Sequence, residues 1–159
     1  MGRLEYTRLH DRLLAGRMPV SDRHVETLRA EGVTTVINLC EDHEYWDGER
    51  QAVAAACARA GITELRLPVI DGSTVSAAVL EEAAAAAAGD GVVYVHCRGG
   101  RERSAAVTIA LLAAASGTSV DEAHERALGL RPGFKPLPWQ VEGVRSWLRD
   151  RGGRRILDP

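Results

Sequence analysis

The chain has 159 residues, of which 45% are hydrophobic and 26% charged, and its formal net charge at pH 7 is -2. This length suffices for one domain with a substantial core, and the small net charge excludes a global attraction to nucleic acid or to a membrane surface. The three cysteines are odd in number and widely spaced, so we expect no disulfide framework and a reducing, cytoplasmic setting.

Further features of the composition narrow the class of protein. Residues 1–5 contain no apolar run, so no signal peptide is predicted, and the alanine-rich stretches 83–88 and 105–115 are too short to span a bilayer. No metal-ligand spacing is present, and we expect neither a metal nor a cofactor. The high alanine and arginine content suggests a bacterial genome rich in GC. We expect one domain over residues 1–151 and a loose tail over 152–159, with the oligomeric state left open.

Strands and helices alternate along the first two thirds of the chain. In chain order we predict a strand at 13–16, a helix at 21–31, a strand at 33–39, a helix at 49–60, a strand at 62–69, a helix at 75–88 and a strand at 91–95. Ser21 can cap the first helix, and Gly32 and Gly61 can end the first two. Residues 33–39 are β-branched and apolar, as in a buried strand.

Three helices, near 104–116, 119–130 and 137–150, complete the chain. The alternation before them indicates an α/β fold, with a central, mostly parallel sheet flanked by helices. Ligands bind such sheets outside the carboxyl ends of the strands. We therefore expect segments 39–42 and 68–71 to converge with the loop that follows residue 95.

That loop is the most informative part of the sequence. Residues 96–104 read HCRGGRERS and lie between a predicted strand and a predicted helix. A short glycine-rich loop at a helix N-terminus points backbone N–H groups inward, and the helix dipole adds positive potential, which makes an anion site. A cysteine at its rim would be held as the thiolate. A thiolate that faces a bound phosphate is a nucleophile aimed at phosphorus.

His-Cys, five residues and Arg-Ser, with Gly100 three residues after the cysteine, resemble the signature of the cysteine-dependent protein tyrosine phosphatase superfamily. The short chain suggests its dual-specificity branch, and the resemblance covers about residues 4–148. It implies the protein tyrosine phosphatase fold and a metal-independent phosphomonoesterase that works through a phosphocysteine intermediate. The implied substrate is phosphotyrosine, in a phosphorylated protein or a small molecule, with phosphoserine and phosphothreonine as further candidates.

The same resemblance implies roles for the residues of the loop. Cys97 is the nucleophile, Arg103 clamps two phosphate oxygens, and Ser104 hydrogen-bonds the sulfur to help it leave in the second step. His96 orders the loop. The other residues implied in phosphate binding are Arg98, Gly99, Gly100, Arg101 and Glu102.

A phosphatase of this type also needs an acid that protonates the leaving alcohol. Asp71 is the candidate, because it follows a Pro-led apolar stretch at a strand end and so resembles the acid of dual-specificity phosphatases. Asp42 and Asp47 are the alternatives. The simpler interpretation is that Asp71 and Gly72 only form a turn, since Asp-Gly is a common turn pair.

Cys40 ends the strand predicted at 33–39. The sequence Asn-Leu-Cys there is similar to the lipid-phosphatase branch of the superfamily, in which such a cysteine forms a reversible disulfide with the nucleophile, here Cys97. A nearby thiol of this kind rescues an oxidised thiolate. The alternative is a small buried side chain, and that is the interpretation for Cys57.

The extra cations Arg98 and Arg101 resemble those of phosphatases acting on inositol phosphates or phosphoinositides, which is the alternative function. Glu102, where the family usually has Gly, opposes a polyanion. A catalytically inactive phosphate-binding module is a third hypothesis, disfavoured because the nucleophile, the arginine and the acid are all present.

Several residues outside the loop are weaker candidates. Residues 42–46 can form a pocket wall. Gln140 is a candidate for positioning the hydrolytic water, by resemblance to a family glutamine near that place. Trp139 and Trp147 lie eight residues apart on one predicted helix face, which is more typical of core than of a binding surface.

Overall fold

The computed structural model describes residues 2–152 and has one five-stranded sheet, in the order β1-β2-β5-β3-β4. The strands are β1 Tyr6–His10, β2 Leu13–Gly16, β3 Val33–Asn38, β4 Thr63–Arg66 and β5 Val92–His96. All neighbouring strands are parallel except β1, which pairs antiparallel with β2 at one edge. In the central register, Val95 of β5 lies between Ala15 and Ile37. The predicted α/β class with a mostly parallel sheet is confirmed.

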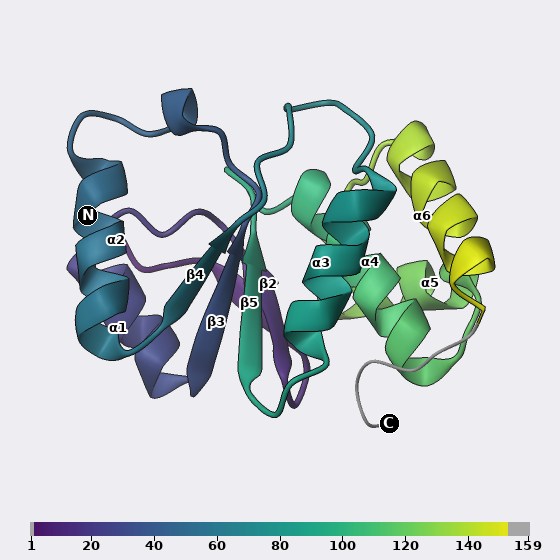
Figure 1. Cartoon of the computed structure of the whole chain (residues 1–159), viewed down its shortest axis with the longest axis horizontal. Coiled ribbons are helices and arrows are strands. Elements are labelled where there is room, and N and C mark those ends of the chain that lie inside the picture. The colour runs from purple at the N-terminus through teal and green to yellow at the C-terminus, as the bar shows by residue number, and fades with distance from the viewer. Residues whose placement is uncertain (1, 153–159) are drawn as a thin grey trace.

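Six helices of the described chain flank the sheet. Helices α1 (Asp22–Ala30) and α2 (Glu49–Ala60) lie on one side, and α3 (Ala77–Ala87), α4 (Arg103–Ser116), α5 (Val120–Leu130) and α6 (Pro138–Arg151) on the other (Figure 1). Three begin at serines whose side chains accept a backbone N–H two or three residues into the helix, namely Ser21, Ser76 and Ser119. These caps satisfy donors that the first helical turn leaves unpaired.

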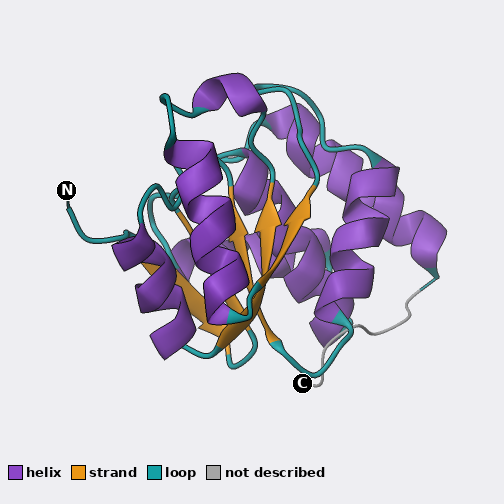
Figure 2. Ribbon diagram, turned by 60° about the vertical axis from the view of Figure 1, so that its left-hand side comes forward, coloured by secondary structure: helices purple, strands orange, loops and turns teal. Residues whose placement is uncertain are grey.

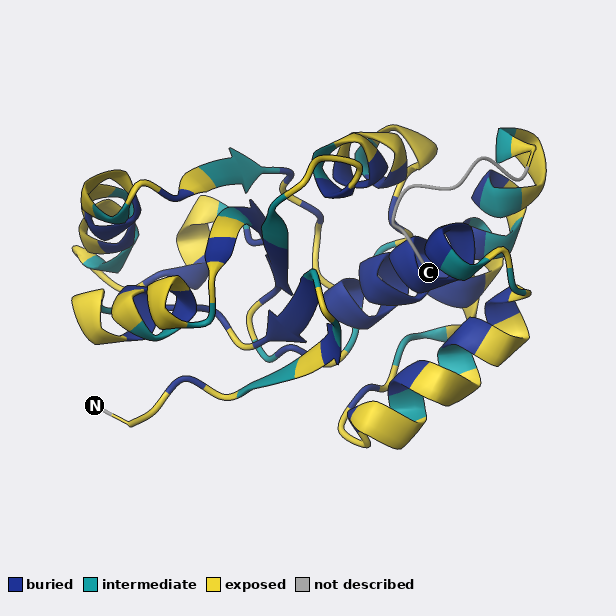
Figure 3. Cartoon of the chain, turned by 90° about the horizontal axis from the view of Figure 1, so that it is seen from below, coloured by how far each residue is buried: buried dark blue, intermediate teal, exposed yellow. Residues whose placement is uncertain are grey.

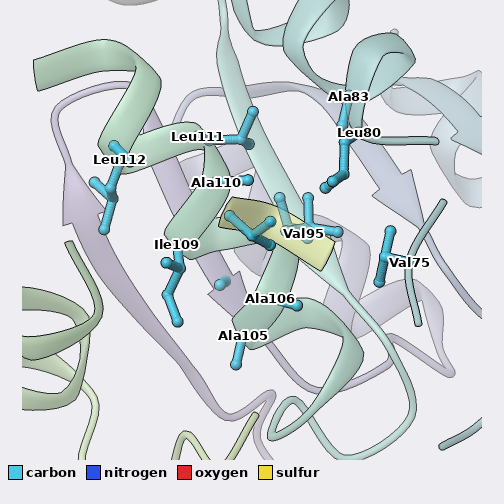
Figure 4. Close-up of a cluster of buried hydrophobic side chains, with 14 of the residues drawn as sticks. Val75, Leu80, Ala83, Val95, Ala105, Ala106, Ile109, Ala110, Leu111 and Leu112 are labelled. Carbon is cyan, nitrogen blue, oxygen red and sulfur yellow. The ribbon is translucent and has the colours of Figure 1, made fainter. Parts of the chain in front are cut away.

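The core forms because strand side chains alternate between the two faces. Val93 and Val95 pack in the larger apolar cluster with α3 and α4, whereas Tyr94 packs in the smaller cluster with α1 and α2. Figure 4 shows Val95 among small and branched side chains of α3 and α4. Helix α4 is buried over residues 103–115 (Figure 3). Its many alanines let it lie close to both the sheet and its neighbouring helices.

The carboxyl ends of the parallel strands meet at one edge, where the loops gather at the top of Figure 2. Backbone hydrogen bonds continue past the strand ends: Leu39 N–H donates to His96 C=O at 3.0 Å, and Val69 N–H donates to Leu39 C=O at 3.0 Å. The convergence expected for the three segments is confirmed.

The structure differs from the sequence-based elements in four places. The strand predicted at 62–69 is shorter, β4 Thr63–Arg66, and residues 67–69 continue only as irregular backbone. Strand β1 was not predicted, because Tyr6–His10 mixes charged and apolar residues and buries only Leu9. A 3-10 turn, η1 (Asp42–Glu44), follows β3 and is too short to have a periodic pattern. Helix α3 begins at Ala77 rather than at residue 75, because Ser76 is its cap.

Within residues 2–152, no single helix is long and apolar enough to cross a membrane; α4 and α5 pass that test only as a pair, bent by 118°. Gly152 ends α6. The rest of the tail expected over 152–159 lies outside the described residues.

Candidate active site

The loop between β5 and α4, residues 97–102, is called the Cys97 loop here, and it turns tightly against β2. Gly100 has a φ of +69°, and a Cβ there would lie 2.6 Å from the carbonyl carbon and oxygen of Gly16. Only glycine fits such a position. Three further contacts hold the loop: Met18 N–H to Arg98 C=O at 3.1 Å, Arg131 Nε to Gly100 C=O at 3.2 Å, and Lys135 N–H to Arg101 C=O at 2.7 Å.

Cys97 lies at the floor of this loop and is 3% exposed. Its Sγ lies 3.3 Å from the Oγ of Ser104, which is fully buried in the first turn of α4. No side chain caps the N-terminus of α4, so its first N–H groups stay available to an anion. The sulfur, the hydroxyl and the helix N-terminus therefore face the same small volume.

Arg103 is 2% exposed and is held in place by an acid. Its Nη1 and Nη2 donate to the two carboxylate oxygens of Glu44 at 2.8 and 2.6 Å, and Nη1 also lies 2.9 Å from Val69 C=O. The buried Nε has no hydrogen-bond acceptor within residues 2–152. This edge of the guanidinium is thus left for a ligand oxygen, while Glu44 fixes its orientation.

Glu44 was not singled out from the sequence, although it lies in the segment 42–46 expected to form a pocket wall. Burial, the largest single influence, would raise the pKa of its carboxyl, but the hydrogen bonds from Arg103 and from the Glu41 N–H, together with the nearby positive charge, hold that pKa below its usual range. The only available signal was that Glu44 closely follows a strand end expected to approach the Cys97 loop.

Replacing Glu44 by glutamine should lower the free energy of unfolding by about 3 kcal/mol, because it leaves the buried Arg103 charge without its counter-ion. Since the folded pKa of Glu44 is lowered, its stabilisation is present at neutral pH and is lost as the pH falls. The difference in stability should therefore shrink below roughly pH 4. Denaturant melts at several pH values measure it.

Glu64→Gln is the matched control for that variant. Glu64 forms another buried Arg–Glu pair of the described chain, with Arg50 at 2.9 Å, and it does not contact Arg103 or the Cys97 loop. Both variants should lose stability, but only Glu44→Gln should change kcat/KM per folded molecule. Equal kcat/KM in the two variants would contradict a role for Glu44 in positioning Arg103.

Asp71 lies at the mouth of the site. Its side chain is 74% exposed, and its Oδ1 lies 3.6 Å from Arg103 Nε. Of the alternatives, Asp42 pairs with Arg66 at 2.5 Å, and Asp42 and Asp47 both line the pocket beside Trp46. Of the three candidate acids, Asp71 is the one that contacts Arg103 in the described chain.

The loop that carries Asp71, residues 70–74, is tied to the start of α6. Trp139 Nε1 donates to Gly72 C=O at 2.8 Å, and Gln140 Nε2 donates to Ser73 C=O at 3.0 Å. The core interpretation of Trp139 was wrong: it is 52% exposed, whereas Trp147 is 5% exposed and lies in the core. The indole N–H of Trp139 donates to a backbone carbonyl 67 residues away, and no local sequence pattern predicts such a contact.

Gln140 is fully buried, and its Oε1 also accepts the N–H of Leu137 at 2.9 Å. These contacts make it a bridge between α6 and the loop 70–74. Its water-positioning role stays a prediction.

Trp139→Phe keeps the ring but removes the donor to Gly72. Because one hydrogen bond contributes about 1 kcal/mol, we expect hydrolysis of substrates with poor leaving groups to slow by roughly 2- to 10-fold. Trp147→Phe is the control, since its buried Nε1 has no partner within residues 2–152. A comparable slowing in both variants would show that the Gly72 contact does not position Asp71.

His96 is fully buried, and burial lowers its pKa to about 4, so the ring is neutral at pH 7. Its Nδ1 lies 3.1 Å from Cys97 C=O, where it acts as donor. This is the contact that a loop-ordering role requires.

Leu39 N–H donates to His96 C=O, and Cys40 and Cys97 are the next residues along these two neighbouring segments. It is fully buried, and burial raises the pKa of its thiol well above the usual range. Cys57 packs in the smaller core cluster, as expected.

If Cys40 protects the nucleophile, peroxide should first oxidise Cys97 to a sulfenic acid. The Cys40 sulfur should then displace water from it and form a disulfide. Because the pKa of Cys40 is raised, this second step should be slow and should accelerate with rising pH. Mass spectrometry of peroxide-treated protein measures it, with Cys57 as internal control. Sulfinic acid on Cys97 without a Cys40–Cys97 disulfide would contradict it.

The segment 42–46 forms one side of a pocket of about 490 Å³, which Trp46 lines with Tyr45, Arg50 and Arg66. Trp46 is 74% exposed. Glu44 of the same segment holds Arg103, so this pocket adjoins the site.

Comparison with known proteins gives a consistent family. Residues 9–134 match the family model described as "Swiss Army Knife protein, DSP-PTPase phosphatase domain". The mouse protein named "Phosphatidylglycerophosphatase and protein-tyrosine phosphatase 1" is 27% identical over 150 residues, which cover 91% of this chain and 77% of the mouse protein. The matched span contains the Cys97 loop, Glu44 and Asp71.

Solved structures show the same likeness. PTPMT1 is 27% identical with a TM-score of 0.80, over 92% of this chain and 95% of that one. Its complex with PI(5)P gives 26% identity and 0.76, over 91% and 95%. Human DUSP28 is 28% identical with a TM-score of 0.70, over 92% and 94%. In each case the likeness extends over nearly the whole chain.

Proposed function

The chain belongs to the family of dual-specificity-type protein tyrosine phosphatase domains, and from this membership we propose that it is a metal-independent phosphomonoesterase that hydrolyses phosphotyrosine through a phosphocysteine intermediate. Phosphoserine and phosphothreonine are further candidate substrates. The observation that carries the proposal is the placement of Cys97 Sγ at the N-terminus of α4, beside Ser104 Oγ and next to a guanidinium that Glu44 holds in position.

In the first step, the Cys97 sulfur attacks phosphorus and the bond from phosphorus to the ester oxygen breaks. Asp71 gives its proton to the departing oxygen. The Nε edge of Arg103 and the N–H groups of the Cys97 loop bind the phosphate oxygens throughout, where negative charge is held in the transition state.

In the second step, water attacks phosphorus and the sulfur–phosphorus bond breaks. The Asp71 carboxylate takes a proton from that water, and Ser104 donates a hydrogen bond to the departing sulfur. Inorganic phosphate leaves and the enzyme returns to its starting state, so no metal or redox partner is consumed.

The alternative is an inositol phosphate or phosphoinositide phosphatase with the same chemistry. It is supported by the name of the mouse relative, a phosphatidylglycerophosphatase, and by the PI(5)P complex of PTPMT1. Arg98 does not favour either function, because its Nη1 already donates to Glu44 C=O at 3.1 Å. An inactive phosphate-binding module is disfavoured because Cys97, Arg103 and Asp71 are all in place.

We also propose that residues 1–151 form the catalytic domain of a bacterial protein, and that it works in a reducing, cytoplasmic compartment, where a cysteine nucleophile stays reduced. Phosphate release from an aryl phosphate, from phosphotyrosine, phosphoserine and phosphothreonine peptides, and from inositol polyphosphates tests the function. Preference for the aryl and peptide substrates supports the proposal. Preference for the inositol compounds supports the alternative function. If no substrate releases phosphate in a Cys97-dependent way, the hypothesis of an inactive phosphate-binding module is supported.

A further inference from the structure

Arg17 comes directly after β2 and is brought to the Cys97 loop by the backbone on both of its sides. Gly16 lies against Gly100, and Met18 N–H donates to Arg98 C=O at 3.1 Å. Arg17 N–H donates to Glu5 C=O at 2.9 Å, which fixes the segment from the other side. The side chain itself is exposed. The backbone of Arg17 is therefore held in place next to the loop, and its charged side chain faces solvent. Arg17 lies outside the phosphatase signature.

A pocket of about 330 Å³ opens beside the Cys97 loop and is lined by Arg17, Gly99, Arg101 and Arg131, with Glu5 and Thr7. Gly99 is two residues from the nucleophile, so this pocket adjoins the place where the reacting phosphate binds. Arg101 is exposed like Arg17. Within residues 2–152, neither of these two guanidinium groups donates a hydrogen bond, and their charges only add, as weaker causes, to the lowering of the pKa of Glu5.

The carboxylate of the pocket, Glu5, is paired chiefly with Arg131. Both oxygens of the Glu5 carboxylate accept hydrogen bonds from Arg131 at 2.6 Å, and these bonds hold the pKa of Glu5 below its usual range. Arg131 also donates to Thr7 Oγ1 at 3.0 Å and to Gly100 C=O at 3.2 Å. This pair is occupied in supporting the loop. Arg17 and Arg101 are left as two like charges that share one pocket, an arrangement that a bound anion stabilises.

We propose that Arg17 and Arg101 form a second anion subsite, which binds a second phosphate group of the substrate while the first is hydrolysed at Cys97. Two guanidinium forks match the several oxygens of a phosphate dianion. The inference rests on the proposed function, which supplies hydrolysis of the first phosphate at Cys97. It makes Arg17, outside the signature, a residue that determines specificity. A headgroup lipid and a soluble sugar phosphate present the same chemistry to this subsite.

Binding to the Cys97→Ser protein tests the subsite separately from turnover. Calorimetric titrations with myo-inositol 4-phosphate and with myo-inositol 4,5-bisphosphate give the ratio of the two dissociation constants. We expect the bisphosphate to bind at least about 10-fold more tightly, because each charge-assisted hydrogen bond is worth more than a neutral one. Arg17→Gln should reduce this ratio by roughly 10-fold, and Arg149→Gln, an equal charge change on α6, should leave it unchanged.

An unchanged ratio in Arg17→Gln, or no preference for the bisphosphate at all, would overturn the subsite. Equal losses in Arg17→Gln and Arg149→Gln would also overturn it, since they would reflect only net charge. Dioctanoyl phosphatidylinositol 4,5-bisphosphate, titrated as a monomer, identifies the source of the anion: tighter binding than the free headgroup favours a lipid, and equal binding favours a soluble phosphate. Failure of the proposed function is seen separately, as absence of Cys97-dependent phosphate release from the protein with its natural cysteine.

Discussion

Cys97→Ser is expected to reduce phosphate release by on the order of 10⁶-fold, since loss of the nucleophile in a covalent catalyst costs about this much. The change replaces one buried atom, and Ser104, Arg103 and the N-terminus of α4 keep their places around it. The serine hydroxyl is a far weaker nucleophile than a thiolate and a poorer leaving group from phosphorus in the second step. The variant should therefore bind phosphate or vanadate like the natural protein and yet turn over no substrate.

Cys57→Ala is the control for this result, because it removes a buried cysteine from the smaller core cluster without touching the site. Initial rates on an aryl phosphate, together with mass spectrometry of rapidly quenched protein, measure both the loss and the intermediate. The natural protein and Cys57→Ala should carry a phosphate on Cys97. Near-natural activity in Cys97→Ser would sink the covalent mechanism.

The Cys97 loop could be predicted because its signature lies within nine consecutive residues, 96–104. The strand, the glycine that turns and the helix start are local features, and each has its own sequence signal. The mostly parallel character of the sheet followed from the alternation of strands and helices, whereas the order of the strands was not predicted. Strand β1 was not predicted because it forms by pairing with β2 at the edge of the sheet, where Leu9 is its one buried apolar side chain.

The parts of the site that could not be predicted are the contacts between distant segments. Glu44 meets Arg103 across 59 positions, and Arg131 meets Glu5 across 126. A charged side chain in a loop is usually solvated, so nothing local distinguishes Glu44 from Asp42 or Glu49. Only the convergence of strand ends, with the burial that follows, turns one of these acids into the partner of the arginine proposed to bind phosphate.

Glu44 and Arg131 also show how the site is made rigid. Glu44 pairs with Arg103, the first residue of α4. Arg131 pairs with Glu5 and also donates to Gly100 C=O of the Cys97 loop. An ion pair in such a place adds little net stability, because desolvation cancels much of the attraction. Its value here is positional: it fixes where the phosphate donors point before a substrate arrives, so that no reorganisation is needed during the reaction.

Asp71→Ala is expected to slow hydrolysis of substrates with poor leaving groups by roughly 10²- to 10⁴-fold, the usual contribution of a general acid. Aryl phosphates with good leaving groups need little protonation, so their rates should fall much less. Asp42→Ala and Asp47→Ala, which remove the alternative acids, should leave this dependence unchanged. A series of aryl and alkyl phosphates with the three variants measures it, and a uniform small loss in Asp71→Ala would place the acid elsewhere.

The position of Asp71 supplies the reason for this expectation. Its carboxylate lies 3.6 Å from the edge of Arg103 that Glu44 leaves unpaired. A phosphate that binds this edge of Arg103 would have the Asp71 carboxyl beside it, where the proposed first step needs a proton donor for the departing oxygen. The rate loss in Asp71→Ala should accordingly grow along the series as the leaving alcohol becomes less acidic.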